Sequence, residues 1–216
     1  MKRKACVLGG TGLVGSNLLS LLINDRYYSV INVITRKKIP LQADIITQYI
    51  VDFNNLESVS RAFTVDDVYC CLGTTMKKAG SREAFKQVDY DYVIKTARIA
   101  HEHGAKQFLV ISAVGAHPRS LLFYNRIKGQ MEKDVAAIPF EAVHIFRPSL
   151  LVGQRHEKRF LEDIAQHCTK PLQYIFKGPL KKYAPVEAKH VAYSMLQAAK
   201  AQLHGIYVHE ALWAIA

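Results

Sequence analysis

The chain has 216 residues, of which half are hydrophobic and 22% are charged, and its formal net charge is +11. This composition suits one globular domain with a sizeable core, and it excludes disordered and collagen-like chains. No uninterrupted apolar run reaches about 18 residues, so we expect no membrane-spanning helix.

Short apolar runs alternate with stretches of helical periodicity along the first two thirds of the chain. In order, we expect a strand at 5–8, a helix at 13–23, strands at 30–35 and 44–51, a short helix at 56–63 and a strand at 68–72. Ser81 is expected to cap a long helix that ends at His103, just before Gly104. A strand at 107–113, a helix at 119–137 and a strand at 142–146 follow.

The pattern weakens after Gly153, where we expect helices at 159–167 and 187–200 and a last strand at 205–209. This remainder is long enough for a small cap at 154–200 but too short for a second full domain. Strands that alternate with helices predict an α/β fold with a doubly wound parallel sheet and helices on both faces. We therefore expect a single domain over residues 1–216.

A glycine-rich turn follows the first predicted strand and opens the first helix. Free amides at a helix start, together with glycines that permit close approach, are typical of a site for the pyrophosphate of a dinucleotide. The same region superficially resembles a signal peptide, but its glycines interrupt the apolar run. The candidate cofactor-binding residues of this turn are Gly9, Gly10, Thr11, Gly12, Leu13, Val14 and Gly15.

The second predicted strand ends where an NAD-preferring site usually carries an acidic residue. Arg36 and Lys37 stand there instead. Because a guanidinium can pair with a 2′-phosphate, these residues favour NADP(H), with NAD(H) possible and an ordinary surface arginine as the alternative interpretation. Asp52, after the third strand, is a candidate for the adenine amine or for capping the next helix.

Tyr124 and Lys128 stand four residues apart on a predicted helix, and Ser112 lies near the end of the strand before it. Ligands bind beyond the carboxyl ends of parallel strands, so these residues are expected to meet there. A nearby ammonium favours phenolate, and we expect Lys128 to lower the pKa of Tyr124. The three residues predict a catalytic set in which Ser112 holds a substrate oxygen and Lys128 also binds the nicotinamide ribose. A half-buried aromatic, a surface lysine and a strand-end serine are the alternative.

The polar and basic residues outside these motifs point to little further chemistry. The chain's cysteines lack zinc-ligand spacing, and adjacent Cys70 and Cys71 suit no disulfide, so we expect buried thiols in a reducing, cytoplasmic compartment. His101 and His103 point to different helix faces and predict no metal site, while His144 is expected in a buried strand and His190 on a helix surface. The basic residues form small scattered groups, which argues against nucleic-acid binding.

Five stretches in order along the chain carry a family resemblance: VLGGTGLVGSNLL, VYCCLGTT, VDYDYVIKTA, YNRIKG and IFRPSLLVG. Together they resemble the atypical short-chain dehydrogenases/reductases, and in particular the Tat-interacting-protein-like oxidoreductases. The resemblance covers residues 3–153 well and implies an NADP(H)-binding Rossmann domain with Ser112, Tyr124 and Lys128 as its catalytic set. It also implies cofactor contacts from Leu72, Gly73, Thr74, Lys128, Arg147, Pro148 and Leu150.

One departure from that family concerns proton supply. Better-known members carry an asparagine that supports a proton relay, whereas Asp89 stands at the helix position that we compare. We therefore expect an NADP(H)-dependent reductase of a small carbonyl substrate. The alternatives are a non-enzymatic NADPH sensor with a protein partner, and an enzyme like a sugar-nucleotide epimerase. The chain is expected to be a monomer or a homodimer that uses helices 82–103 and 119–137.

Overall fold

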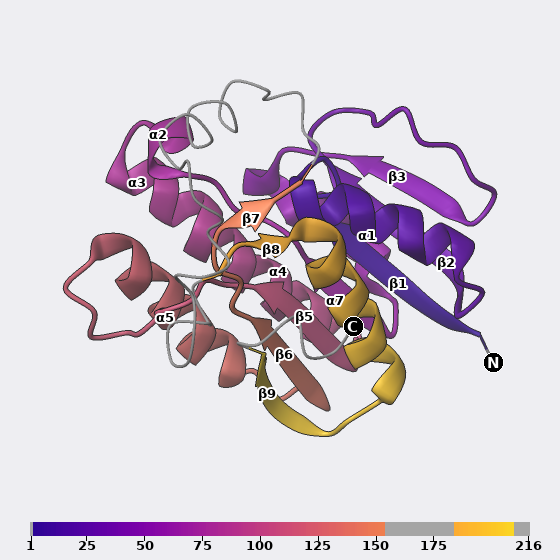
Figure 1. The fold of residues 1–216 in the computed structure, drawn as a ribbon. Helices are drawn as coiled ribbons and strands as arrows, with labels where there is room; N and C mark the ends of the chain where they lie inside the picture. The colour runs from indigo at the N-terminus through magenta and orange to yellow at the C-terminus, as the bar shows by residue number, and fades with distance from the viewer. Residues whose placement is uncertain (1, 154–183, 210–216) are drawn as a thin grey trace.

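A computed structural model describes residues 2–153 and 184–209 of the chain (Figure 1). The helix expected at 159–167, Cys168 and most of the expected cap lie outside these residues. No helix among the described residues is long and apolar enough to cross a membrane.

Seven parallel strands form one sheet in the order β3-β2-β1-β4-β5-β6-β9. The chain runs from the interior strand β1 to the β3 edge, then returns to β4 beside β1 and continues to the other edge. The point where the strand order reverses, where dinucleotides bind in such folds, therefore lies between β1 and β4. The predicted doubly wound sheet is confirmed. Its strands are β1 (Arg3–Leu8), β2 (Tyr28–Thr35), β3 (Ile46–Ile50), β4 (Asp67–Cys70), β5 (Gln107–Ile111), β6 (Ala142–Phe146) and β9 (Gly205–His209).

Helices cover both faces of the sheet (Figure 1). α1 (Leu13–Asn24) and α7 (Ala188–Ala201) pack side by side on one face. The opposite face carries the 3-10 segment η1 (Phe53–Phe63), α4 (Tyr92–Glu102) and α5 (Phe123–Ala136). α7 falls within the expected cap at 154–200, yet it belongs to the layer that covers the sheet. Unpredicted small elements are α2 (Met76–Ala79) and the strand pair β7 (Leu151–Val152) and β8 (Val186–Glu187).

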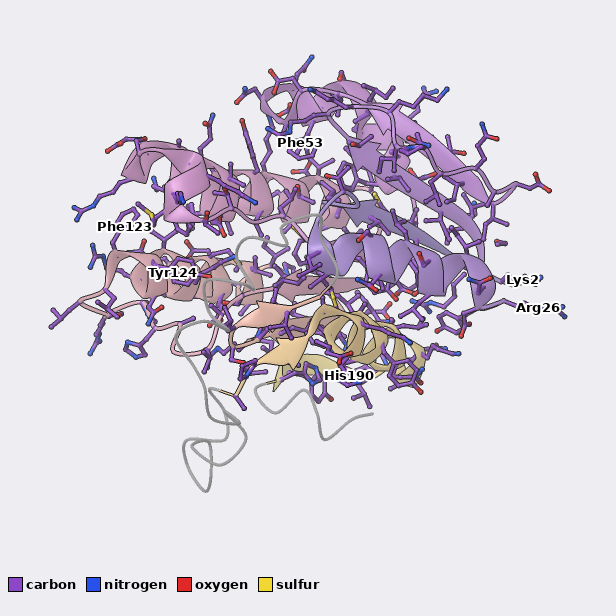
Figure 2. All side chains as sticks on the ribbon, turned by 45° about the horizontal axis from the view of Figure 1, so that its top comes forward. Lys2, Arg26, Phe53, Phe123, Tyr124 and His190 are labelled. Carbon is purple, nitrogen blue, oxygen red and sulfur yellow. The ribbon has the colours of Figure 1, made fainter. Side chains whose placement is uncertain are left out.

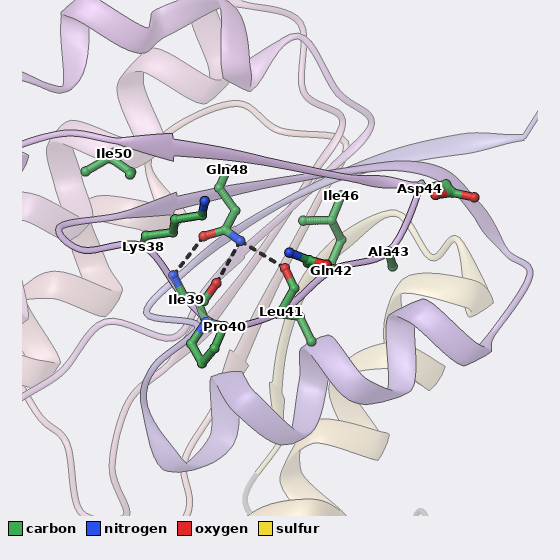
Figure 3. Close-up of a pocket in the computed structure, with 10 residues that line it drawn as sticks. All are labelled: Lys38, Ile39, Pro40, Leu41, Gln42, Ala43, Asp44, Ile46, Gln48 and Ile50. Atoms are coloured by element: carbon green, nitrogen blue, oxygen red, sulfur yellow. Dashed lines mark hydrogen bonds between the residues drawn. The ribbon is translucent and has the colours of Figure 1, made fainter.

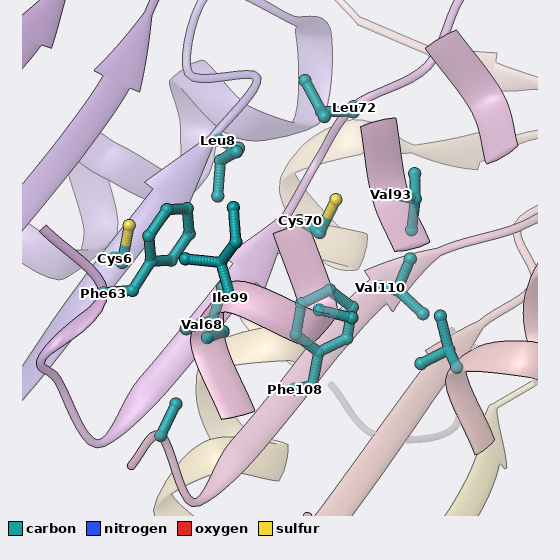
Figure 4. Close-up of a cluster of buried hydrophobic side chains, with 14 of the residues drawn as sticks. Cys6, Leu8, Phe63, Val68, Cys70, Leu72, Val93, Ile99, Phe108 and Val110 are labelled. Carbon is teal, nitrogen blue, oxygen red and sulfur yellow. The ribbon is translucent and has the colours of Figure 1, made fainter. Parts of the chain in front are cut away.

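The core has two halves because successive strand side chains point to opposite faces of the sheet. In β1, Ala5 and Val7 join the cluster under α1 and α7, whereas Cys6 and Leu8 join the cluster under α4 and α5. Figure 4 shows this second cluster, in which side chains of β1, β4 and β5 meet Phe63, Val93 and Ile99. Burial on both faces explains why the strands read as apolar runs.

The helix predicted from Ser81 to His103 has the right ends but is not continuous. The Ser81 hydroxyl accepts from the Ala84 amide, and Gly104 has a φ of +83°, as a cap at each end requires. Between α3 (Arg82–Lys86) and α4, however, lies the π-helical turn η2 (Gln87–Asp91). Such a turn inserts an extra residue into a helix and is frequent at functional sites.

The loop between β5 and α5, near the sheet's carboxyl edge, is longer at both ends than predicted. β5 ends at Ile111 rather than at residue 113, so Ser112 lies just beyond the strand. α5 begins at Phe123 rather than at residue 119, which places Tyr124 in its first turn. Both changes leave the side chains of Ser112 and Tyr124 at the edge where ligands bind in this fold.

Candidate active site

The glycine turn is shaped by close backbone contacts that only glycine permits. Gly9 has a φ of +77°, and a Cβ there would lie 2.4 Å from the carbonyl oxygen of Cys71. A Cβ on Gly15 would lie 2.3 Å from the carbonyl oxygen of Gly9, which itself accepts from the Gly12 amide at 2.8 Å. The turn after β1 therefore packs directly against the chain that leaves β4.

The start of α1 offers an anion a favourable electrostatic environment. Gly12 is its N-cap and supplies no side chain, and the first turn holds no acidic residue. The first amides of a helix have no partner within the helix and carry its positive dipole end. These features fit the pyrophosphate predicted from the sequence.

The residues after β2 remain candidates for the adenosine end. Arg36 and Lys37 are exposed directly after this strand, and the Thr35 hydroxyl donates to the Lys37 carbonyl at 2.8 Å and turns the chain. Asp52 caps η1, because its carboxylate accepts from the Asn54 amide at 3.0 Å. Hydrogen bonds from Asn54, and to a lesser extent the nearby charge of Arg36, lower the pKa of Asp52. The capping interpretation of Asp52 is thus confirmed.

An open hollow of about 780 Å³ lies beside these residues, between edge strand β3 and the loop that follows Lys38 (Figure 3). The Gln48 side chain holds this loop, donating to the carbonyls of Ile39 and Leu41 and accepting from the Ile39 amide. A Cβ on Gly10 would lie 3.4 Å from Ile39 Cδ1, so the loop also packs near the glycine turn. The hollow contains none of the expected catalytic residues.

Lys128 and Asp89 form a buried ion pair at the centre of the site. Lys128 Nζ lies 2.8 Å from Asp89 Oδ1 and also donates to the Ile111 carbonyl at 3.2 Å. The other carboxylate oxygen, Asp89 Oδ2, accepts from the Thr74 amide at 2.8 Å. Asp89 is 1% exposed and Lys128 is 2% exposed. Burial favours the neutral amine, but Asp89, with smaller contributions from Tyr124 and Cys70, outweighs it, and the pKa of Lys128 is raised.

The Tyr124 ring packs against Phe85 of α3 at an interplanar angle of 45°, with ring centroids 5.3 Å apart. In Figure 2, Tyr124 lies at the opposite end of the molecule from Lys2 and Arg26. Lys128 does act to lower the pKa of Tyr124, as predicted, but burial is the larger influence and Asp89 adds to it, so the pKa of Tyr124 is raised. Although 36% of the residue is exposed, the protein around it disfavours the phenolate.

Ser112 lies beside the end of β6. Its amide donates to the Phe146 carbonyl at 2.7 Å, and the Val114 amide donates to the Pro148 carbonyl at 2.9 Å. Its buried hydroxyl has no hydrogen-bond partner within residues 2–153 and 184–209. An orphaned buried hydroxyl is uncommon in proteins and fits a role in holding a ligand oxygen.

The remaining expected cofactor contacts differ in what their side chains do. Arg147 makes a two-point ion pair with Glu132 of α5, with Nε and one terminal nitrogen 2.9 and 2.6 Å from the two carboxylate oxygens. This pair ties α5 to the end of β6. Leu72 is buried in the core, Gly73 is exposed, and Leu150 is 47% exposed. Their cofactor contacts stay predictions.

The sequence argument missed the partnership between Asp89 and Lys128. A signal for it exists, because Phe85, Asp89 and Val93 are spaced four residues apart on the apolar face of the helical segment. An acidic residue on a buried face needs a cation or several donors. The donors come from Lys128 and Thr74, which are distant in sequence.

The described residues fit a dinucleotide in three respects. The glycines let the turn pack tightly at the start of α1, the first turn of α1 holds no acidic residue, and the buried Ser112 hydroxyl has no hydrogen-bond partner among the described residues. All three features lie at the carboxyl edge of the sheet, around the strand-order switch between β1 and β4.

Comparison with known proteins identifies relatives of the whole domain. A family model described as NAD(P)H-binding matches residues 9–150. The chain is 36% identical over 157 residues to Protein HTATIP2 of Rattus norvegicus, covering 71% of this chain but only 64% of that protein. It is 31% identical over 214 residues to Protein FMP52, mitochondrial, of Coccidioides immitis, covering 92% and 86%. That name assigns the fungal relative to mitochondria, and a cytoplasmic location for this chain stays a prediction.

Solved structures share the fold at low identity. MoeE5 in complex with UDP-glucose and NAD matches with a TM-score of 0.72 at 16% identity, covering 95% of this chain and 74% of that one. The Bordetella bronchiseptica enzyme WbmH in complex with NAD+ matches with a TM-score of 0.71 at 15% identity, covering 95% and 75%. The family match covers well over half of the chain, and its fold agrees with the motifs and the sheet order. The chain belongs to the NAD(P)H-binding family, among the atypical short-chain dehydrogenases/reductases with a Rossmann fold.

Proposed function

We propose that the chain is an NADP(H)-dependent reductase of a small carbonyl compound. The observation that carries this proposal is the buried Lys128–Asp89 pair, which lies at the ligand-binding edge together with Tyr124 and the unpartnered hydroxyl of Ser112. A structural ion pair alone would need neither an orphaned serine nor a neighbouring phenol.

The chain's own residues would divide the work as follows. When bound, the reduced nicotinamide supplies a hydride for the carbonyl carbon. Ser112 Oγ donates to the carbonyl oxygen and orients it, and Tyr124 Oη gives that oxygen its proton. Lys128 fixes the electrostatics around the phenol, and the turn from Gly9 to Gly15 holds the pyrophosphate.

The preference for NADP(H) over NAD(H) rests on the residues after β2. Arg36 and Lys37 are exposed there, and neither is an acid that would repel a 2′-phosphate. A guanidinium can donate two parallel hydrogen bonds to a phosphate.

The test is turnover of NADPH with a panel of carbonyl compounds by the wild type and by Tyr124→Phe. This change removes the hydroxyl and keeps the ring on Phe85. We expect the rate to fall by about 100-fold or more, because the proton donor is lost, while calorimetry finds NADPH affinity unchanged. A Tyr193→Phe variant, which alters a half-exposed tyrosine of α7, should keep full activity. Equal turnover in Tyr124→Phe would exclude the proposed role.

One observation favours a second candidate, a non-enzymatic NADPH sensor. The Lys128 ammonium is already engaged by Asp89 and by the Ile111 carbonyl, which leaves it fewer donors for a ligand. A sensor would bind NADPH, turn over no carbonyl compound and bind a protein partner with an affinity that depends on NADPH. UDP-sugars in the same panel test the epimerase-like alternative, which the solved neighbours raise.

A further inference from the structure

Asp89 gives the site a third ionisable group, bound directly to Lys128. We propose that Asp89 counteracts the charge of Lys128 and thereby helps to keep the Tyr124 phenol protonated near neutral pH, so that Tyr124 enters the proposed reduction as a proton donor. This inference rests on the proposed function and adds the protonation state in which Tyr124 works.

The geometry fixes Asp89 from three sides. The π-helical turn η2 carries it, Lys128 of α5 binds one carboxylate oxygen, and the Thr74 amide after β4 binds the other. Lys128 is held in turn by the carbonyl of Ile111, the residue before Ser112. The ion pair itself is 2.8 Å long and buried, so the two charges stay adjacent rather than separating into solvent.

The charges that act on Tyr124 come from two elements, Lys128 on α5 and Asp89 on η2. Phe85 of α3 is an apolar neighbour. Cys70 of β4, which faces Lys128, stays an uncharged thiol because burial raises its pKa to about 12. An ammonium alone would favour phenolate, but burial, the largest influence on Tyr124, favours the phenol, and the carboxylate beside the ammonium opposes part of its effect. The pKa of Tyr124 is accordingly raised above its ordinary value of 10.

The chemical consequence concerns the proton that the phenol of Tyr124 gives in the proposed reduction. In reduction, hydride adds to the carbonyl carbon, the electron pair of the C=O bond moves to oxygen, and that oxygen takes the proton of Tyr124. Water then returns a proton to the tyrosinate, so one carbonyl, one reduced nicotinamide and one proton give an alcohol and the oxidised nicotinamide. The protonated phenol is therefore the form of Tyr124 that this reduction uses.

The direct test is an ultraviolet titration of phenolate formation in the protein without cofactor. Because the chain has 11 tyrosines, each curve is read as the difference from the matching variant that also carries Tyr124→Phe. In the wild type we expect Tyr124 to ionise above its ordinary pKa. In Asp89→Asn, which leaves the ammonium unopposed, we expect the pKa of Tyr124 to fall by about 1 to 3 pH units.

Asp91→Asn is the matched control, since Asp91 is in the same turn but exposed, 3.8 Å from Lys86 Nζ. It should leave the titration of Tyr124 unchanged. Lys128→Met is a second variant in case Asp89→Asn fails to fold, and in it the pKa of Tyr124 should rise further. A wild-type value below the ordinary one, or no shift in either variant at the pair, overturns the inference.

A kinetic readout separates this inference from the proposed function. In the wild type, the rate of carbonyl reduction should stay level through neutral pH and fall only as Tyr124 ionises. In Asp89→Asn, that fall should move to lower pH by the shift seen in the titration. If no carbonyl compound is reduced, the proposed function fails, whereas the titration still decides whether Asp89 controls the phenol.

Discussion

The glycine turn gives the most direct test of the fold at the site, through Gly15→Ala. A Cβ at Gly15 would lie 2.3 Å from the Gly9 oxygen, 2.9 Å from its carbonyl carbon and 3.0 Å from Gly10 Cα. Ordinary contacts begin near 3.4 Å, so α1 and the turn must separate by about 1 Å. All three neighbours are backbone atoms, which cannot turn aside as a flexible side chain can.

Two effects of this change oppose each other. Alanine is favoured over glycine inside a helix by about 1 kcal/mol, whereas overpacking a tight contact costs about 1 to 3 kcal/mol. We therefore expect a net loss of about 1 kcal/mol in the free energy of unfolding. Because the displaced turn no longer presents its amides correctly, the Kd for NADPH should rise tenfold or more, about 1.4 kcal/mol.

Urea unfolding and calorimetry with NADPH measure the two outcomes. Ser20→Ala on the exposed side of α1 is the control, since it removes only a hydroxyl that donates to the Ser16 carbonyl. It should leave NADPH binding unchanged and, by helix propensity, raise stability by up to about 0.5 kcal/mol. A Gly15→Ala protein that is more stable than the wild type and binds NADPH normally would refute the close-packing argument.

Two further predictions concern charge. Arg36→Ser should weaken NADPH binding by about 10- to 100-fold, because it removes a charge-assisted contact to the 2′-phosphate, and should leave NADH binding unchanged. Calorimetry with both cofactors measures this. The control Arg26→Ser, at the other end of β2, should change the binding of neither cofactor. Burial, and next the charge of His209, lower the pKa of His144 from 6.5 to about 4. Its neutral ring therefore stabilises the fold above pH 6.5, and urea unfolding should show a loss of about 2 kcal/mol as the pH falls from about 7.5 to about 5, most of which disappears in His144→Phe.

The fold was predictable because its signals are local and repeated. Apolar strand runs, a glycine turn between the first strand and helix, and the stripe that buries Val191, Met195 and Leu196 in α7 each follow from short-range periodicity. Strand ends were less predictable, since Leu72 and Ser112 are apolar or buried like strand residues although they lie past the ladder. Side chains stay buried beyond the last residue that pairs in the sheet. The sequence pattern therefore does not distinguish buried strand residues from buried residues that follow a strand.

The π-helical turn was not predictable from the sequence. Residues 82 to 102 satisfy helical periodicity, and no glycine or proline interrupts them. The extra residue serves a contact made far along the chain, between Asp89 and Lys128. Helix continuity is thus decided here by tertiary packing, which local propensity does not contain.

The net rise in the pKa of Tyr124 was unpredictable for the same reason, because it depends on groups outside the motif. A tyrosine and a lysine four residues apart define a two-body interaction, in which the ammonium stabilises phenolate. In the folded chain three groups interact, because Asp89 lies 2.8 Å from the same ammonium and opposes part of its effect, while burial disfavours the phenolate more strongly than the ammonium favours it. The motif contains only Tyr124 and Lys128, so it predicts a phenol that ionises easily. With Asp89 and burial included, the phenol of Tyr124 keeps its proton more readily. The acid or base character of this site follows from the element opposite the motif, the turn η2, as much as from the motif itself.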